Sequence, residues 1–190
     1  MNLEATIINP HLWVEKYADY LYTYALTRIN DEEQAKDLVQ ETFLAALENI
    51  EKFQGKSSEK TWLTAILKHK IFDIYRTRVS AVNKKNYSMN SVTSQNFFQL
   101  DDGHWKIEHR PVEFAIQEPG AIENREFYHI LQACLKKLPA LWIAVFTMKF
   151  MDDCNTESIC RELKVTTANY WVIIHRTKIN LRACLQKNWL

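Results

Sequence analysis

Basic and aromatic side chains gather in two stretches of this chain of 190 residues. Residues 60–85 carry seven Lys or Arg against one acidic residue, and residues 161–190 carry six against one. Cationic side chains neutralise phosphates, and exposed aromatic rings stack on unpaired bases. A charged stretch is also typical of a solvated surface, but two basic stretches with aromatic neighbours predict a protein that grips a nucleic-acid backbone at two places.

The front of the chain has the opposite charge. Residues 1–59 hold 11 acidic and five basic residues, which leaves a net charge of −6, although the whole chain has a net charge of +1. Asp37, Gln40 and Glu41 are three and four positions apart, so they share one side of a helix. The sequence therefore predicts an exposed acidic helix face near the front, which is also what a merely solvated helix would carry.

Residue patterns of catalytic centres do not occur in the sequence. It contains no glycine-rich phosphate loop, nucleophile motif or paired carboxylates. His104 and His109 have no Cys or His cluster beside them, which speaks against a metal site. We therefore expect no enzyme, no cofactor and no metal. The four cysteines form no CxxC pair, and in a reducing compartment they predict buried thiols rather than a disulfide framework: Cys134, Cys154, Cys160 and Cys184.

Three amphipathic helices are predicted for the front of the chain. Apolar residues recur at helical spacing within residues 12–28, from residue 30 to about residue 50, and from residue 60 to about residue 78. Asn30 followed by Glu33 predicts a capping box at the start of the second helix. Seven residues of that helix are predicted to face inward: Ala35, Leu38, Val39, Thr42, Phe43, Ala46 and Leu47.

The rear of the chain predicts four further helices. The first of them stops before Pro139, which suits the first turn of the next. Thr156 is predicted to cap a short helix, Thr166 is predicted to cap a last helix of up to about 20 residues, and Lys164–Val165 forms the turn between them. These two helices form a predicted helix-turn-helix, although their apolar spacing also suits a generic helical hairpin.

Together these elements predict an all-α protein with two small helical domains. Residues 1–80 form one and residues 121–190 the other, joined by a flexible linker over residues 81–120, where polar residues, prolines and glycines interrupt the periodicity. No apolar run approaches the roughly 20 residues that cross a bilayer. The N-terminal sequence also lacks the basic start of a signal peptide, so we expect a cytoplasmic protein without direct membrane insertion.

The order of the acidic helix and the helix-turn-helix resembles that of bacterial sigma factors of the sigma-70 family, of the small extracytoplasmic-function (ECF) type. The run Asp37-Leu-Val-Gln40-Glu41-Thr-Phe43 looks like the region 2.2 helix, which docks on the coiled-coil clamp of the polymerase β′ subunit. The resemblance implies that Asp37, Gln40, Glu41 and Phe43 bind RNA polymerase.

The basic helix that follows resembles regions 2.3 and 2.4, which capture and hold the opened strand of the minus-ten promoter element. The spacing of Trp62 with Ile66 favours core packing, and Tyr75 is the better candidate for stacking on a base, with Phe72 as a further exposed ring. His69 stands where the family usually has Asn. The resemblance implies minus-ten contacts for Lys60, Trp62, Lys68, His69, Tyr75, Arg76 and Arg78.

The rear domain resembles region 4, which reads the minus-thirty-five element as duplex DNA. Trp171-Val172-Ile173 replaces the usual basic or polar trio of the recognition helix. This predicts fewer salt-dependent contacts and more apolar contacts to thymine methyl groups if these side chains face DNA, but they equally suit a protein partner. The residues implied in this contact are Thr166, Thr167, Asn169, Trp171, Val172, Arg176 and Lys178.

A sigma factor of this kind implies transcription initiation as the function and three partners: core RNA polymerase (β′ clamp and β flap), promoter DNA and an anti-sigma factor. Two other functions remain open on the residues alone. A stand-alone helix-turn-helix DNA-binding regulator would bind duplex tightly without polymerase. A helical adaptor for an acidic partner would show weak salt dependence of any DNA binding.

Overall fold

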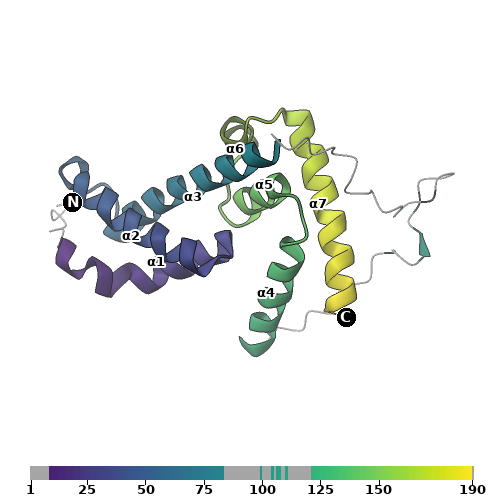
Figure 1. Ribbon diagram of the computed structural model, residues 1–190, viewed down its shortest axis with the longest axis horizontal. Helices are drawn as coiled ribbons and strands as arrows, with labels where there is room; N and C mark the ends of the chain where they lie inside the picture. The colour runs from purple at the N-terminus through teal and green to yellow at the C-terminus, as the bar shows by residue number, and fades with distance from the viewer. Residues whose placement is uncertain are drawn as a thin grey trace, which may run out of the picture. The chain divides into compact units, whose positions relative to one another are not determined.

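The computed structural model describes residues 9–83 and 121–189 and five positions between them, 99, 104, 106, 107 and 110. All regular secondary structure in this part of the chain is helical (Figure 1). The prediction of an all-α fold is therefore confirmed. The contacts within the chain divide it into two compact units, residues 1–76 and residues 77–190, which we describe one at a time.

The front unit is built on three helices, α1 (Trp13–Ile29), α2 (Glu32–Glu48) and α3 (Glu59–Asn83), with 3-10 turns at Pro10–Leu12 and Ile50–Lys52. Its buried residues recur every three or four positions on each helix, which is the spacing of one helix face. Buried side chains of this core are Trp13, Leu21, Ala25, Ile29, Ala35, Leu38, Val39, Thr42, Ala46, Leu63, Leu67, Ile71, Phe72 and Tyr75.

The boundary between α1 and α2 differs by one residue from the prediction. Asn30 ends α1 in the left-handed conformation, with φ of 55°, which Asn tolerates better than most residues. Asp31 is the N-cap of α2, and its side chain accepts a hydrogen bond of 3.0 Å from the backbone N–H of Gln34. The predicted capping box of Asn30 with Glu33 is wrong, because Asn30 is used to stop the preceding helix.

A buried carboxylate ties the amino end of α3 to the start of the chain. Glu59 accepts hydrogen bonds from Trp13 Nε1 at 3.0 Å, from the Tyr17 hydroxyl at 3.0 Å and from the backbone N–H of Asn9 at 3.2 Å. Burial favours the neutral acid, but these bonds and the charge of Lys16 outweigh it, so the pKa of Glu59 lies below its ordinary value. Burial and the Glu59 carboxylate together raise the pKa of Tyr17.

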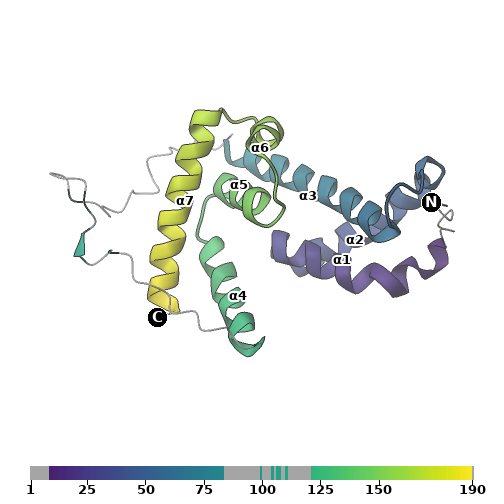
Figure 2. The ribbon, with the colours of Figure 1, turned by 180° about the vertical axis from the view of Figure 1, so that it is seen from behind.

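The rear unit contains α4 (Ala121–Leu135), α5 (Ala140–Phe150), α6 (Thr156–Leu163) and α7 (Thr167–Asn188). In both views of the ribbon α4 lies beside the carboxyl half of α7, while α5 and α6 lie near its amino half (Figures 1 and 2). The core between α5, α6 and α7 buries Trp142, Ala144, Val145, Thr147, Met148, Ile159, Leu163, Tyr170, Ile173, Ile174 and Thr177.

The helix-turn-helix has the predicted residues and nearly the predicted caps. Thr166 caps α7, since its side chain accepts a hydrogen bond of 3.2 Å from the backbone N–H of Asn169. Lys164 ends α6 in the left-handed conformation. The cap of α6 is Asn155 rather than Thr156, because the Asn155 side chain reaches the N–H of Ser158 at 2.8 Å. Pro139 directly precedes α5 as its N-cap.

Two of the four cysteines are joined, contrary to the prediction of buried thiols. Cys134 on α4 and Cys184 on α7 form a disulfide whose Cα atoms are 5.8 Å apart. The two residues are 50 positions apart in the sequence and meet only because α4 packs against α7. Cys154 and Cys160 are free thiols, as predicted, but they are half-buried rather than buried.

Candidate nucleic-acid interface

The acidic face of α2 is solvent-exposed. Asp37, Gln40 and Glu41 are all exposed, and Phe43 is half-buried. Leu44 continues the same stripe one turn further on and is 60% exposed. Carboxylates therefore stand beside an exposed leucine on this face. The sequence analysis did not single out Leu44, although its spacing of seven from Asp37 could have done so.

The orientation of Leu47 on the same helix differs from the prediction. It was predicted to face inward, but it is 47% exposed. Ala46 and Thr42, one and five positions before it, fill the inward side of this end of α2. The apolar stripe is therefore narrower than its periodicity suggested, and Leu44 and Leu47 form an exposed apolar pair next to the acidic residues.

A polar hollow of about 280 Å³ lies between α2 and α3. Glu41 accepts a hydrogen bond of 3.0 Å from the Lys70 ammonium, which joins the two helices across it. The acidic face of α2 and the basic helix α3 thus meet at an ion pair. Residues lining the hollow are Gln34, Asp37, Leu38, Glu41, Lys70, Asp73 and Ile74.

The predicted minus-ten cations lie on α3 with different degrees of exposure. Lys60 and His69 are exposed, whereas Lys68, Arg76 and Arg78 are half-buried. Arg76 forms an ion pair with Asp73 one turn before it. The Lys60 ammonium lies 3.7 Å from the centre of the Tyr20 ring, which places a cation over an exposed aromatic ring of α1. The sequence analysis did not identify Tyr20, because the ring lies on the first helix and not on the basic helix that it singled out.

Tyr75 does not present its ring to solvent. Its side chain is only 2% exposed, and its hydroxyl donates a hydrogen bond of 3.3 Å to the Arg28 carbonyl. Its ring packs on that of Phe72, which is also buried, with centroids 6.4 Å apart. The prediction that Tyr75 or Phe72 stacks on a base is therefore wrong, because both lie on the core face that Leu67 and Ile71 extend along α3.

Trp62 is the half-buried ring of α3. Its ring centroid lies 5.9 Å from that of Trp13 in an edge-on contact and 4.8 Å from that of Phe53 in a tilted contact. One part of the indole thus belongs to the aromatic packing at the amino end of α3, as its spacing predicted, while the rest remains accessible.

The predicted minus-thirty-five residues lie at the N-cap and in the amino half of α7. Thr166 and Thr167 are exposed at its amino end, and Asn169 is half-buried. Trp171 is 57% and Val172 41% exposed, so this turn presents an apolar surface to solvent. The aligned backbone dipoles and free N–H groups at the amino end of a helix favour a phosphate nearby.

The two cations of this set continue along α7. Arg176 is half-buried and Lys178 is exposed, with the Lys178 ammonium 5.3 Å from the centre of the Phe150 ring. Lys178 thus borders α5, while Arg176 follows the line of Asn169 and Val172 along α7.

An apolar groove of about 650 Å³ lies between α4, α5 and α7. The sequence analysis did not identify it, because its walls come from three helices. His175, Lys178 and Arg182 supply its polar groups, and its apolar lining consists of Phe127, Leu131, Phe146, Ile179, Leu181 and Leu185.

Within the described residues, no helix is both long and apolar enough for a bilayer. The same part of the chain holds no group of three or more His, Cys, Asp or Glu that could bind a metal ion.

Comparison with known proteins identifies the family of this chain. The family model of Sigma-70 region 2 matches residues 13–80, which include α1, α2 and most of α3. A probable RNA polymerase sigma factor from Haemophilus influenzae is 34% identical over 176 residues, covering 93% of this chain and 89% of that protein. The ECF RNA polymerase sigma factor SigX from Bacillus subtilis is 25% identical over 169 residues, or 87% of this chain and 77% of SigX.

The solved structure of the sigma factor RpoE with the anti-sigma factor NepR, from Bartonella quintana, has a TM-score of 0.45 and 17% identity over 94% of this chain and 97% of that one. This structural similarity is too weak to support an argument about the fold. The match to the Haemophilus protein extends over most of both chains and is sufficient to assign the family. The chain belongs to the RNA polymerase sigma factors of the sigma-70 family, of the extracytoplasmic-function type.

Proposed function

We propose that this sigma factor joins core RNA polymerase, directs it to promoters with two spaced elements and helps to open the first of them. The observation that carries the proposal is the exposed face of α2, where Asp37, Gln40 and Glu41 adjoin Leu44. A face that combines charge with an exposed apolar anchor is suited to a protein partner. A regulator that acts through its helix-turn-helix alone has no use for it.

The α2 face is proposed to bind the β′ clamp through Asp37, Gln40, Glu41 and Phe43. Phe43 is half-buried, so it contributes the edge of its ring rather than a free side chain. Glu41 is already paired with Lys70 on α3, and this ion pair couples the polymerase-binding face to the DNA-binding helix. The rear unit is proposed to contact the β flap.

The minus-ten element is proposed to bind along α3. Lys60, Lys68, His69, Arg76 and Arg78 supply charge to the phosphates of the opened strand. Since Tyr75 is buried, the rings proposed to stack on a base are the accessible part of Trp62 and the exposed ring of Tyr20 beneath the Lys60 ammonium.

The minus-thirty-five element is proposed to bind at the amino half of α7. Trp171 and Val172 offer apolar contacts to thymine methyl groups, and the exposed Thr166 and Thr167 lie next to the helix N–H groups. Arg176 and Lys178 contribute phosphate contacts, and Asn169 completes the set. This combination is supported by the capped, correctly ordered helix-turn-helix of α6 and α7.

The division into domains is proposed to follow the sequence: residues 1–80, a linker over residues 81–120, and residues 121–190. Most of the linker lies outside the described residues. The protein is proposed to work in the cytoplasm, where polymerase is, without catalysing a reaction itself and with an anti-sigma factor as a further partner.

Transcription by core polymerase with and without this protein tests the proposal. We expect initiation at promoters with two spaced elements only when the protein is added. The double variant Asp37→Ala, Gln40→Ala should bind core polymerase at least tenfold more weakly and lose transcripts in proportion, because it removes two groups from an interface centre. Binding to core is measured by titration of labelled protein.

Glu32→Ala is the matched control, because it removes one carboxylate from another side of the same helix. It should bind as the wild type does. Unchanged binding by the double variant would refute the α2 interface. Tight duplex binding without polymerase, together with no added transcripts, would favour a stand-alone regulator instead.

A further inference from the structure

The disulfide between α4 and α7 has one buried and one accessible half. Cys134 is 2% exposed, whereas Cys184 is half-buried. Opening a disulfide requires a thiolate to reach one of the two sulfurs, so access selects the site of attack. Cys184 is therefore the sulfur at which an outside thiol can act, and Cys134 is the sulfur that leaves.

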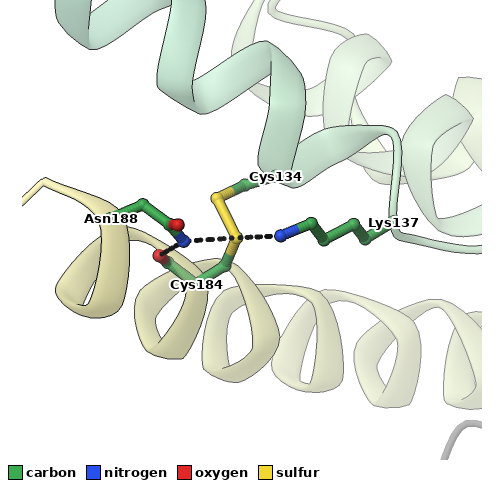
Figure 3. The surroundings of a disulfide bond; sticks show 4 residues. All are labelled: Cys134, Lys137, Cys184 and Asn188. Atoms are coloured by element: carbon green, nitrogen blue, oxygen red, sulfur yellow. Dashed lines mark hydrogen bonds between the residues drawn. A yellow bond between two sulfur atoms is a disulfide. The ribbon is translucent and has the colours of Figure 1, made fainter.

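Two hydrogen-bond donors converge on the Cys184 sulfur (Figure 3). The Lys137 ammonium lies 3.8 Å from Sγ, and the Asn188 amide nitrogen lies 3.5 Å from it. Lys137 lies in the turn that follows α4, and Asn188 lies one turn beyond Cys184 on α7, so the two donors come from different segments of the chain. A positive charge and an N–H beside a sulfur stabilise its thiolate, which is the form that reacts in thiol–disulfide exchange.

We propose that Cys134 and Cys184 are a reversible thiol–disulfide pair, with Cys184 as the exchanging sulfur that Lys137 and Asn188 stabilise as a thiolate. The partner is a dithiol for reduction and a small or protein disulfide for oxidation. The proposal rests on the proposed function in one respect: in the reducing compartment where polymerase works, disulfides are usually transient or redox-sensing rather than structural.

The exchange balances in both directions. In reduction, one thiolate of a dithiol attacks Sγ of Cys184, the S–S bond breaks, and Cys134 leaves as a thiolate that takes up a proton. The second thiol of the reductant then closes its own disulfide and releases Cys184 beside Lys137. In oxidation, the Cys184 thiolate attacks a disulfide such as glutathione disulfide and expels one glutathione, and Cys134 then displaces the second.

The bond has a structural consequence for the rear unit. It closes a chain segment of 50 residues that contains α5, α6 and most of α7. The core cluster around it has Cys134, Leu135 and Leu181 as its buried members, and partly buried apolar residues of both helices pack against them, so the bond links α4 to the carboxyl half of α7 inside this cluster. The same two helices, together with α5, form the walls of the apolar groove. Reduction is expected to loosen α4 and this groove more than the helix-turn-helix.

Equilibration in glutathione buffers tests reversibility. The full-length protein is incubated at fixed ratios of glutathione to glutathione disulfide, trapped by alkylation and quantified by mass spectrometry. We expect both redox forms at ratios within the range of the cell. A bond that stays fully oxidised in excess glutathione is structural, and cysteines that stay reduced in pure glutathione disulfide form no bond. Either result would overturn the proposal.

The thiolate assignment is tested by the rate at which iodoacetamide alkylates Cys184 in the reduced protein. Lys137→Gln should slow this rate roughly three- to fivefold and shift the redox midpoint towards the disulfide, since an exposed charge pair is worth up to about that factor. Lys136→Gln, the matched control, removes the same charge one residue away and should change neither. Equal behaviour of the two variants would show that Lys137 has no such role.

The consequence for the fold is read from thermal unfolding of the oxidised and reduced protein. Oxidation should raise the melting temperature of the rear unit by on the order of 10 °C, because the bond restricts the unfolded chain. Equal melting temperatures would contradict a bond that restrains this unit. None of these readouts involves polymerase or promoter DNA, so they separate a failure of the redox pair from a failure of the proposed function.

Discussion

Glu59 is the residue on which the amino-terminal contacts of the front unit converge. A buried carboxylate is stable in the charged form only if its lone pairs are satisfied, and here an indole, a phenol and a backbone N–H supply three donors. Glu59 also lies in the first turn of α3, where its negative charge interacts favourably with the positive end of the helix dipole. Glu59 therefore positions the amino end of the helix that carries the proposed minus-ten residues.

Glu59→Gln should lower the free energy of unfolding at neutral pH by about 1–3 kcal/mol, because it replaces a charged acceptor of three hydrogen bonds with a neutral amide. The folded pKa of Glu59 is lowered, so its contribution is present above the ordinary value of 4.5 and is lost as the pH falls through the folded pKa. The difference between wild type and variant should thus shrink below pH 4.5.

Urea unfolding at several pH values measures this difference. Glu15→Gln, which removes an exposed carboxylate from α1, is the control and should change stability by less than about 0.5 kcal/mol. A Glu59→Gln variant whose deficit stays constant between neutral and acid pH would contradict the role of the Glu59 charge.

At the scale of elements, α7 serves two surfaces. Its amino half carries Trp171 and Val172 into solvent, and its carboxyl half packs on α4 through the disulfide. A single 22-residue helix thereby joins the proposed DNA-reading surface to the apolar groove. Because the turn at Trp171 is apolar, we expect charge to contribute less to the proposed duplex binding than it would with a basic turn.

Arg176→Ala is expected to weaken promoter binding by the polymerase–sigma complex. It should also reduce the slope of the logarithm of the binding constant against the logarithm of the salt concentration by about one, because one phosphate contact is lost. Fluorescence titration of a promoter fragment at several salt concentrations gives both quantities. Lys187→Ala is the control, since it lies about 16 Å further along the same helix. An unchanged salt slope for Arg176→Ala would exclude a phosphate contact.

At the scale of the whole molecule, the chain contains two compact units, each with its own buried core. Two stabilising features identified above fall one in each unit: the Glu59 cluster in the front unit and the Cys134–Cys184 bond in the rear unit. Units with separate cores are expected to unfold in separate transitions.

Differential scanning calorimetry should therefore resolve two transitions in the oxidised protein. Glu59→Gln should lower the temperature of one by several degrees, and Cys134→Ser with Cys184→Ser should lower only the other. The two single-unit variants serve as controls for each other. One transition that shifts with both changes would mean that the protein unfolds as one cooperative body.

Several properties of this protein follow from its sequence alone. The three- and four-residue spacing of apolar side chains predicted that the regular elements of the described residues are helices, and it located the helix-turn-helix with the Thr166 cap. The exposed positions of Asp37, Gln40 and Glu41 could also be predicted from their spacing. These features are local: a helix face, a cap and a turn depend on residues within four or five positions of one another.

Other properties were decided only by the tertiary structure. Tyr75 is buried because α1 packs over its side of α3 and offers the Arg28 carbonyl to its hydroxyl, 47 positions away in the sequence. Cys134 meets Cys184 because α4 lies along α7. Helical spacing states which residues share a face, but the width of the buried stripe and the partners across it depend on the neighbouring helix. That neighbour is set by packing between segments distant in the chain.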